Sequence, residues 1–231
     1  YGNRPSTLSS DNFETNLKAI ESVLEQTYKN IELIIVDNAS IDNSKNIIKT
    51  KICNDNRAKL IELSENTFVS FGWNFAAKNC NGEYIVSLSG DDYFEKDKIE
   101  KQINYMIKNE LTNSFTWVNC VDDNEKIIYN HHLDKTFNKN LSSFELKKTL
   151  ITEGNTLCAT SFIFHKSIFE KYGYYDHRLL QSQDYDLWLR YSAGKWGKLS
   201  GVIYPNYDTV VLRDSFDFYT GGVDFGFNNP S

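Results

Sequence analysis

The residues best suited to chemistry are two adjacent carboxylates, Asp91 and Asp92. They follow the apolar run 84–89, which is typical of a buried strand, and Gly90, which allows the backbone to turn. Ligands of open α/β sheets bind at the carboxyl ends of the strands, and paired carboxylates there suit a divalent cation that in turn holds a diphosphate. An acidic turn capping the next helix is the competing interpretation, and these residues alone favour it.

Two further acidic positions lie at the ends of predicted elements. Asp37 follows the near-continuous apolar run 31–36, the kind of strand expected in a parallel sheet covered on both faces. Asp184 lies in the first turn of a helix that begins at residue 183. An acid in a first turn ordinarily complements the helix dipole, and without further evidence that is the simplest interpretation of Asp184.

The elements that must position these acids alternate in the first half of the chain. The predicted strands are 31–36, 60–63 and 84–89, and the predicted helices are 12–26, 42–51 and 70–78. Such alternation is typical of a doubly wound sheet with helices on both faces. Neither a G-x-G-x-x-G fingerprint nor a phosphate loop follows any of these strands, so a nucleotide would be bound by another device.

The second half is less regular. Its predicted helices are 96–108, 142–150, 167–171 and the one from residue 183; its predicted strands are 114–121 and 126–129, joined as a hairpin, then 156–164, 198–204 and 207–212. From Ser215 the chain is rich in Gly and Asn, and we expect a mobile tail or part of a following region. The chain begins at Tyr1 without Met, which favours a domain excised from a longer protein or a chain lacking its first strand.

The composition excludes several classes of protein. The net charge of −6 over 231 residues argues against a nucleic-acid binder. No apolar stretch is long enough to span a bilayer, and no signal peptide is visible. The four cysteines are scattered without a Cys-x-x-Cys pair, which argues against a disulfide framework or a zinc site and favours a cytoplasmic protein.

Three segments, in this order, resemble family 2 glycosyltransferases. Residues 26–37, QTYKNIELIIVD, resemble the amino-terminal half; residues 79–94, with Asp91-Asp92, resemble the metal-binding D-x-D segment; and Gly173-Tyr174-Tyr175-Asp176 followed by residues 183–190 resembles the acceptor-side segment. The resemblance extends from residue 1 to about 213. It implies an α/β protein with the Rossmann-like GT-A fold, a central and mostly parallel mixed sheet flanked by helices.

The same resemblance implies how the chain is divided. We expect a single GT-A domain over residues 1–231, with a nucleotide-sugar-binding half at 1–94, an acceptor-binding half at 95–213 and a tail at 214–231. The tryptophans Trp73 and Trp188 are expected in the core.

The activity that the resemblance implies is inverting and metal-dependent. A hexosyl or N-acetylhexosaminyl group would pass from a nucleotide diphosphate sugar, foremost a UDP-sugar, to a hydroxyl of a saccharide or lipid-linked saccharide. The implied cofactor is Mn²⁺ or Mg²⁺, with Asp92 as direct ligand and Asp91 on the donor ribose or a metal-bound water. Asp184 matches the catalytic carboxylate, the base that accepts the acceptor's proton.

The resemblance also implies contacts to the nucleotide. Asp37 matches the position that reads the uracil ring in many relatives, and Tyr1 would stack on that ring, although a frayed terminal aromatic is nearly as simple an interpretation. Asn74 and Lys78 lie in a segment that often faces the nucleotide, and a solvated helix face explains them about equally well. Bacterial polysaccharide or glycoconjugate assembly, in the cytoplasm or at the inner membrane face, fits the family.

Some residues depart from the family pattern. Ser89 stands where many relatives have another Asp, Asn38-Ala39 replaces the commoner Asp-Gly, and Gln183 replaces the commoner Glu. Together with the missing first strand, they motivate an alternative function, a catalytically inactive nucleotide-sugar-binding module. A nucleotidyltransferase would need a basic, Gly-rich phosphate loop near the amino terminus, which the sequence lacks.

Overall fold

The computed structural model describes residues 10–122, 124–128, 143–155, 157–179, 182–193, 208–213 and 222–227. Its helices are α1 (Ser10–Leu24), α2 (Ser44–Ile52), α3 (Val69–Asn79), α4 (Lys98–Lys108), α6 (Ser143–Thr152), α7 (Ser167–Tyr172) and α8 (Gln183–Ala193), with a short 3-10 turn, η1 (Ala159–Ser161). Its strands are β1 (Ile31–Asp37), β2 (Ala58–Glu62), β3 (Tyr84–Ser89), β4 (Tyr93–Phe94), β5 (Asn113–Ser114), β6 (Trp117–Val121), β7 (Ile127–Ile128), β8 (Ile163–His165), β9 (Asp208–Arg213) and β10 (Gly222–Phe227).

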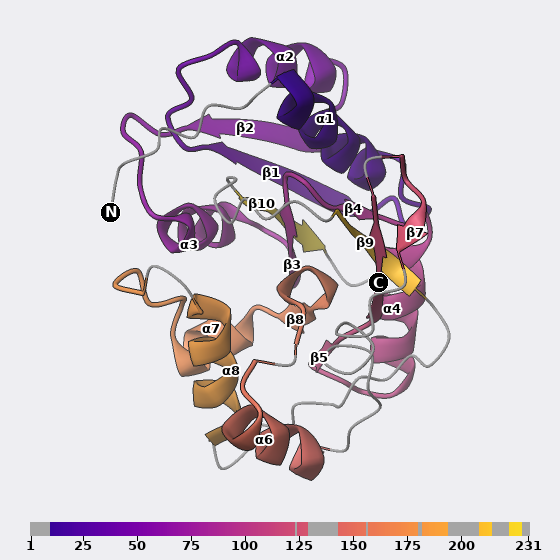
Figure 1. Cartoon of the computed structure of the whole chain (residues 1–231), viewed down its shortest axis with the longest axis vertical. Helices are drawn as coiled ribbons and strands as arrows, with labels where there is room; N and C mark the ends of the chain where they lie inside the picture. The colour runs from indigo at the N-terminus through magenta and orange to yellow at the C-terminus, as the bar shows by residue number, and fades with distance from the viewer. Residues whose placement is uncertain are drawn as a thin grey trace.

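A mixed sheet forms the centre of the molecule, with the strand order β2-β1-β10-β3-β8-β5 (Figure 1). β1 and β2 are parallel, and β10 is antiparallel to both β1 and β3, so β1 and β3 run in the same direction. β8 is antiparallel to β3 and β5. Hence β1, β2, β3 and β5 run one way, and β8 and β10 the other. A smaller sheet has the order β4-β9-β6-β7.

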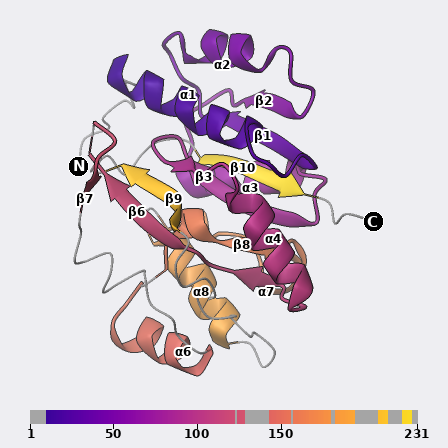
Figure 2. The same ribbon diagram turned by 90° about the vertical axis from the view of Figure 1, so that its right-hand side faces the viewer.

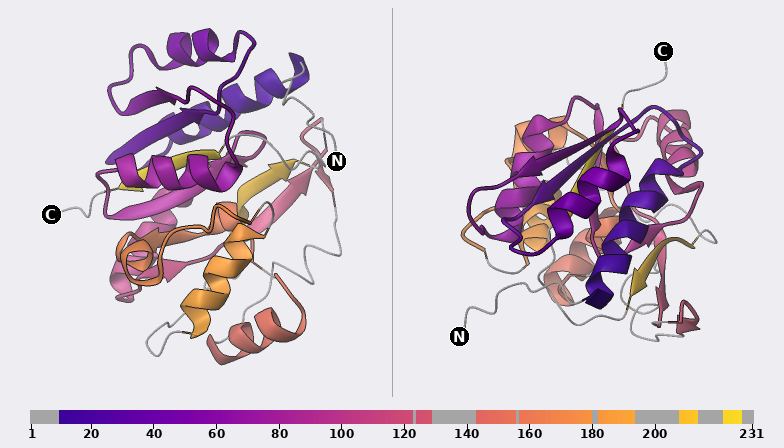
Figure 3. Two further views of the ribbon diagram at one scale, coloured as in Figure 1. Left: turned by 90° about the vertical axis from the view of Figure 1, so that its left-hand side faces the viewer. Right: turned by 90° about the horizontal axis from the view of Figure 1, so that it is seen from above.

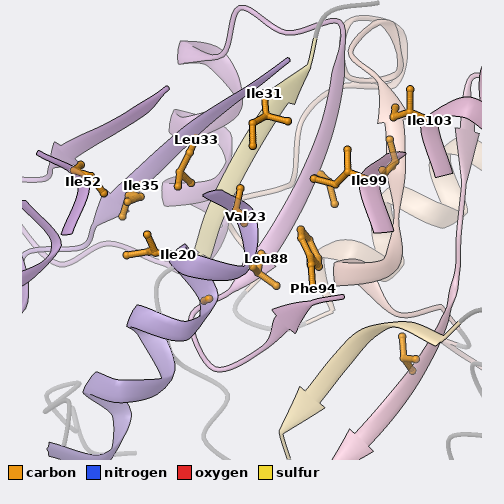
Figure 4. Close-up of a cluster of buried hydrophobic side chains, with 14 of the residues drawn as sticks. Ile20, Val23, Ile31, Leu33, Ile35, Ile52, Leu88, Phe94, Ile99 and Ile103 are labelled. Carbon is orange, nitrogen blue, oxygen red and sulfur yellow. The ribbon is translucent and has the colours of Figure 1, made fainter. Parts of the chain in front are cut away.

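Helices cover both faces of the central sheet. β1 is buried on both faces, as its near-continuous apolar sequence predicts. Its odd-numbered residues, 31 to 35, join a core cluster with α1, α2 and α4 (Figure 4), whereas Ile34 and Val36 pack with Ala76 of α3. α1 and α4 are in front in Figure 2, and α3 and α8 are in front in the left panel of Figure 3.

The face under α3, α6, α7 and α8 has a largely aromatic core. Trp188 of α8 is fully buried and packs edge-on against Phe162, with ring centroids 4.4 Å apart, and against Phe115 at 5.4 Å. Trp73 of α3 is also buried, so both tryptophans lie in the core as predicted. Because Trp188 is one turn after Asp184, this packing fixes the start of α8 relative to the sheet.

Most of the predicted helices and strands are confirmed to within a few residues, and two predictions were wrong. The predicted strand 114–121 is two strands in different sheets, β5 and β6, which are separated by Phe115 and Thr116. Both linking residues are buried, so burial continues where the pairing changes. The predicted strand 156–164 is largely η1, and only its end belongs to β8; there Ser161 Oγ donates to the Cys158 carbonyl, a local bond that competes with strand pairing.

The expected tail also differs from the prediction, because it contributes β10 to the central sheet. β10 lies between β1 and β3 and pairs with both, so the sheet is continuous there. The sequence Gly222-Val223-Asp224-Phe225-Gly226-Phe227 alternates apolar residues with Gly and Asp, a strand signal that the overall Gly and Asn content concealed. The predicted strand 198–204 lies outside the described residues.

Candidate active site

The predicted acids Asp37, Asp91 and Asp92 lie at one edge of the central sheet. Asp37 is the last residue of β1, and Asp91 and Asp92 follow β3 after Gly90. Since β1 and β3 run in the same direction, their carboxyl ends reach the same edge. This is the edge at which ligands bind in sheets of this type.

Asp37 is held by the loop that follows it. Its side chain is almost fully buried; its Oδ2 accepts the Ser40 N–H at 3.0 Å and lies 3.8 Å from Lys45 Nζ. The intervening Ala39 has a φ of 61°, the left-handed region in which a residue with a Cβ costs about 1–2 kcal/mol. The position where the commoner family residue is Gly therefore has a conformation that favours Gly.

Asn38 connects this loop to the segment before α3. Its Oδ1 accepts the Thr67 N–H at 2.8 Å, and its Nδ2 donates to the Thr67 carbonyl at 2.7 Å. The Asn that replaces the commoner Asp therefore joins two loops at the same sheet edge by two hydrogen bonds. An amide provides both the acceptor and the donor that these two hydrogen bonds need, whereas a carboxylate provides only acceptors.

Asp92 is buried, with 8% of its surface exposed, and Asp91 is half-buried. The Asp92 N–H donates to the Ser89 carbonyl at 3.3 Å, which closes the turn after β3. Thr160 Oγ1 lies 3.4 Å from Asp92 Oδ2, a long contact for a hydroxyl donor. Asp92 is thus placed by a backbone turn and faces η1.

Asp184 lies in the first turn of α8 and both of its carboxylate oxygens accept hydrogen bonds. Oδ2 accepts from Asn155 Nδ2 at 2.9 Å, and Oδ1 accepts the Tyr185 N–H at 2.7 Å. Burial raises the pKa of Asp184 above its usual range, and the two donors partly oppose that rise because they stabilise the charged form.

One short part of the chain contacts both acids. Asn155 donates to Asp184 and Thr160 contacts Asp92. Five residues of extended chain span at most about 18 Å, so the Cα atoms of Asn155 and Thr160 lie within that distance of each other. The structure therefore brings contacts to Asp92 and Asp184 together on one segment, although these acids are 92 positions apart in the sequence.

Residues 13–173 match the sequence model of the family described as glycosyl transferase family 2. The chain belongs to this family. It is 36% identical over 184 residues to an uncharacterized glycosyltransferase of Rickettsia typhi, a match that covers 75% of this chain and 53% of the relative. A Bacillus subtilis glycosyltransferase named for teichuronic acid biosynthesis is 35% identical over 97 residues, which are 42% of this chain and 38% of that protein. The chain thus spans about half the length of the Rickettsia relative.

Solved glycosyltransferases share the fold of this family 2 member. The structure of S. aureus TarS 1-349 in complex with UDP-GlcNAc has a TM-score of 0.67 at 15% identity, and the match covers 89% of this chain and 56% of that one. The mannosyltransferase PcManGT from Pyrobaculum calidifontis in complex with GDP-Man and Mn²⁺ has a TM-score of 0.60 at 14% identity, with 89% and 55% covered. The expected GT-A fold is confirmed.

Sequence reasoning missed Lys98 and Cys158, which lie near the Asp91-Asp92 turn. Lys98 is fully buried, its Nζ is 4.2 Å from the centroid of the Phe94 ring, and it has no hydrogen-bond partner in the part of the chain that the structure describes. Burial lowers the pKa of Lys98 to about 7. Cys158 Sγ lies 3.2 Å from Thr160 Oγ1, and burial raises the pKa of this thiol to about 11.

Asn74 and Lys78 both contact the Gly173-Tyr174-Tyr175 segment. Asn74 donates to the Tyr175 carbonyl at 2.7 Å and accepts the Tyr175 N–H at 3.0 Å, so its amide is occupied by the protein's own backbone. Lys78 Nζ lies 4.9 Å from the centroid of the Tyr174 ring. Their role at the nucleotide stays a prediction, and Tyr1, the predicted stacking residue, lies outside the described residues.

Arg190 holds the same segment from α8. Its ion pair with Asp186, at 2.8 Å, joins residues four apart in the helix, and its guanidinium also donates to the carbonyls of Tyr172, Gly173 and Tyr174. Together with Asn74, it fixes the Gly173-Tyr174-Tyr175 segment between α3 and α8. A helix with Asp and Arg four residues apart predicts the ion pair but gives no signal for the carbonyl contacts.

The donor set at Asp91 and Asp92 suits a cation that is shared with a substrate. Within the described ranges, no group of three or more His, Cys, Asp or Glu side chains could hold a metal ion. Two adjacent carboxylates fit a divalent cation whose other ligands are diphosphate oxygens and waters.

Of the helices that the structure describes, none is long and apolar enough to cross a membrane.

Proposed function

We propose that this chain catalyses the inverting transfer of a sugar from a UDP-sugar to an acceptor hydroxyl. The observation that carries the proposal is the set of acids described above. Asp37 and the Asp91-Asp92 pair lie at the ligand-binding edge of the sheet, and Asp184 is contacted from the same segment as Asp92. Membership in glycosyl transferase family 2 supports the reaction class.

Asp184 acts as the general base in this proposal. A carboxylate is a weak base for an alcohol, but it needs only to accept the proton as that proton loosens in the transition state. Burial raises the pKa of Asp184, which makes it a stronger base while the two hydrogen bonds hold its orientation. The site thus combines basicity with a fixed carboxylate plane.

The Asp91-Asp92 turn holds the diphosphate end of the donor. Asp92 would bind Mn²⁺ or Mg²⁺ directly, with Asp91 on the ribose or on a water of that ion. When bound, the ion supplies charge neutralisation for the leaving diphosphate. The Mn²⁺ in the GDP-Man complex of the similar mannosyltransferase supports this assignment.

Asp37 is assigned to the uracil ring. Ser40 and Lys45 both act on its Oδ2, and we assign Oδ1 to the N–H of the base. The UDP-GlcNAc complex of the similar TarS supports a UDP-sugar donor and an N-acetylhexosaminyl group, and Tyr1, Asn74 and Lys78 complete the proposed nucleotide contacts. The acceptor would be a saccharide or lipid-linked saccharide at the cytoplasmic side of the membrane. The name of the Bacillus subtilis relative, which refers to teichuronic acid biosynthesis, supports a place in bacterial polysaccharide assembly.

A panel of nucleotide sugars, assayed with and without Mn²⁺ for release of free nucleotide, tests the proposal. UDP-sugars should release UDP by transfer or slow hydrolysis, and chelation of the cation should abolish the release. Asp184→Asn is the control, because it should bind the donor but release UDP about 10²–10⁴-fold more slowly. Binding of UDP and Mn²⁺ in calorimetry without release from any donor would instead support the inactive binding module.

A further inference from the structure

Asn155 lies between two chain segments and bonds with both. Its Nδ2 donates to Asp184 Oδ2 at 2.9 Å, and its Oδ1 accepts the Leu157 N–H at 3.3 Å. The second bond fixes which end of the amide faces Asp184, because a flipped amide would place its oxygen against a carboxylate and its NH₂ against a backbone donor. The amide therefore has one favourable orientation, with its N–H directed at the acid.

We propose that Asn155 is a positioning residue for Asp184, which fixes the direction of the carboxylate and keeps it ionised. The inference rests on the function proposed above, in which Asp184 is the base. The Tyr185 N–H holds Oδ1 from within α8, and Asn155 holds Oδ2 from outside the helix. With both oxygens held, the carboxylate plane cannot rotate about its last side-chain bond without losing a bond.

Asn155 also sets the charge state of the acid. Burial favours the neutral form of Asp184, and the hydrogen bond from Asn155 is the largest of the effects that oppose it. The charged groups of the neighbouring segments pair elsewhere: Arg190 with Asp186, and Arg178 with Asp176. Burial and hydrogen bonds are the causes of the shift at Asp184, so removing Asn155 takes away the largest effect that opposes burial and leaves only the backbone N–H groups of Tyr185 and Asp184 to oppose it.

The competing interpretation is that Asn155 only closes a local turn through Leu157. Asn155→Ser separates the two roles, because a serine hydroxyl can still accept the Leu157 N–H but no longer presents the amide donor that Asp184 accepts. Asn155→Ala removes both bonds. A turn residue alone would change stability in the alanine variant and leave the titration of Asp184 unchanged in both variants.

The primary measurement is the pKa of Asp184 by ¹³C carboxyl NMR, with its signal identified by its loss in Asp184→Asn. We expect both Asn155 variants to raise this pKa by about one pH unit or more, since a hydrogen bond to a charged group is typically worth that much. Asn109→Ala is the matched control, because exposed Asn109 donates from Nδ2 to a carbonyl of its own helix and should leave the pKa unchanged. A pKa that moves by less than about 0.3 unit in the serine variant would overturn the inference.

The second measurement is the pH profile of kcat/KM for UDP release. In the Asn155 variants, its acidic limb should shift to higher pH by the same amount as the NMR pKa. Donor affinity should stay within about two-fold. If Asp184→Asn retains turnover, the proposed base is wrong, yet the NMR titration still decides whether Asn155 controls Asp184. If the NMR pKa moves and the limb does not, the positioning role in catalysis is overturned.

Discussion

Asp184, which is half-buried, and Asp92, which is buried, both lie next to the end of a regular element, and their described contacts differ. Asp184 accepts two short hydrogen bonds from N–H groups, at 2.7 and 2.9 Å. The contact of Asp92 with Thr160 is a 3.4 Å approach of a hydroxyl that also lies 3.2 Å from a thiol. Behind Asp92 the protein places a buried lysine without a hydrogen-bond partner among the described residues.

The difference suggests two ways of preparing a carboxylate. A base must already point along the path of the proton, so its orientation has to be set by the protein before the substrate arrives. A ligand of a shared cation gains its strongest contact only when cation and diphosphate bind. We therefore expect substitutions around Asp184 to change rates and substitutions around Asp92 to change binding.

The largest effect is expected for Asp184→Asn, which removes the base and preserves the size of the side chain. Transfer should fall by about 10²–10⁴-fold, the range that general base catalysis contributes, while UDP affinity stays within a few-fold. Steady-state rates and calorimetry measure the two quantities. Asp97→Asn is the control, because Asp97 is a partly exposed acid beside the first turn of α4 that pairs with Lys101 on the surface. Near-normal turnover in Asp184→Asn would mean that another group accepts the proton.

Asp92→Asn tests the second acid and is expected to change binding rather than rate. Loss of the negative charge should weaken Mn²⁺-dependent UDP binding by about 10–100-fold, which corresponds to a charge-assisted contact of about 1.5–3 kcal/mol. In the presence of EDTA, the variant and the wild type should bind UDP equally weakly, because the cation is then removed from both. Equal affinities in Mn²⁺ would show that Asp92 does not hold the cation.

The sequence predicted the residues of the two acid sites better than their surroundings. Strand β3 and the turn after it follow from an apolar run, a Gly and two Asp, all adjacent in the sequence. The start of α8 and its first-turn acid were equally visible. The contacts of Asn155 and Thr160 were not, because each joins residues that are far apart in the sequence and meet only in the folded chain. Thr160 also lies in a segment that was predicted as a strand and forms η1.

The burial of Lys98 could not be predicted from the sequence either. A lysine at the start of a helix is ordinarily solvated, and nothing in its neighbours along the chain distinguishes it. Its burial follows from packing between Phe94 and the Cys158 segment, and Cys158 is 60 positions away in the sequence. Likewise, Asn74 was predicted to face a nucleotide, and only the structure shows that its amide forms two hydrogen bonds with the backbone of Tyr175.

Lys98→Met tests whether the buried ammonium behind Asp92 is a cost to the fold. Replacing a buried, poorly paired charge by an apolar side chain of similar volume often stabilises a protein by about 1–4 kcal/mol, and we expect a gain in that range at pH 7. Denaturant unfolding measures it. A loss of several kcal/mol would mean that the ammonium is well compensated in solution.

The pH dependence of the same variant has a defined sign. The folded-state pKa of Lys98, about 7, is below the ordinary lysine value of 10.5, so between these values the unfolded chain binds more protons. The unfolding free energy of the wild type should therefore rise from pH 7 to about 9, and Lys98→Met should lack this rise. Above about pH 9, Cys158 acts in the opposite sense, because its folded-state pKa is raised to about 11.

The smallest effect is expected for Thr160→Val, which removes the hydroxyl between Asp92 and Cys158 and nearly preserves the volume of the side chain. A contact of 3.4 Å contributes little, so Mn²⁺-dependent UDP affinity should stay within about two-fold, measured by calorimetry on both proteins. By comparison, Asn155→Ser, which removes a hydrogen bond to Asp184, should shift the acidic limb of the pH profile of kcat/KM to higher pH by about one unit. A large loss of cation-dependent binding in Thr160→Val would show that the Thr160 hydroxyl contributes to the position of Asp92.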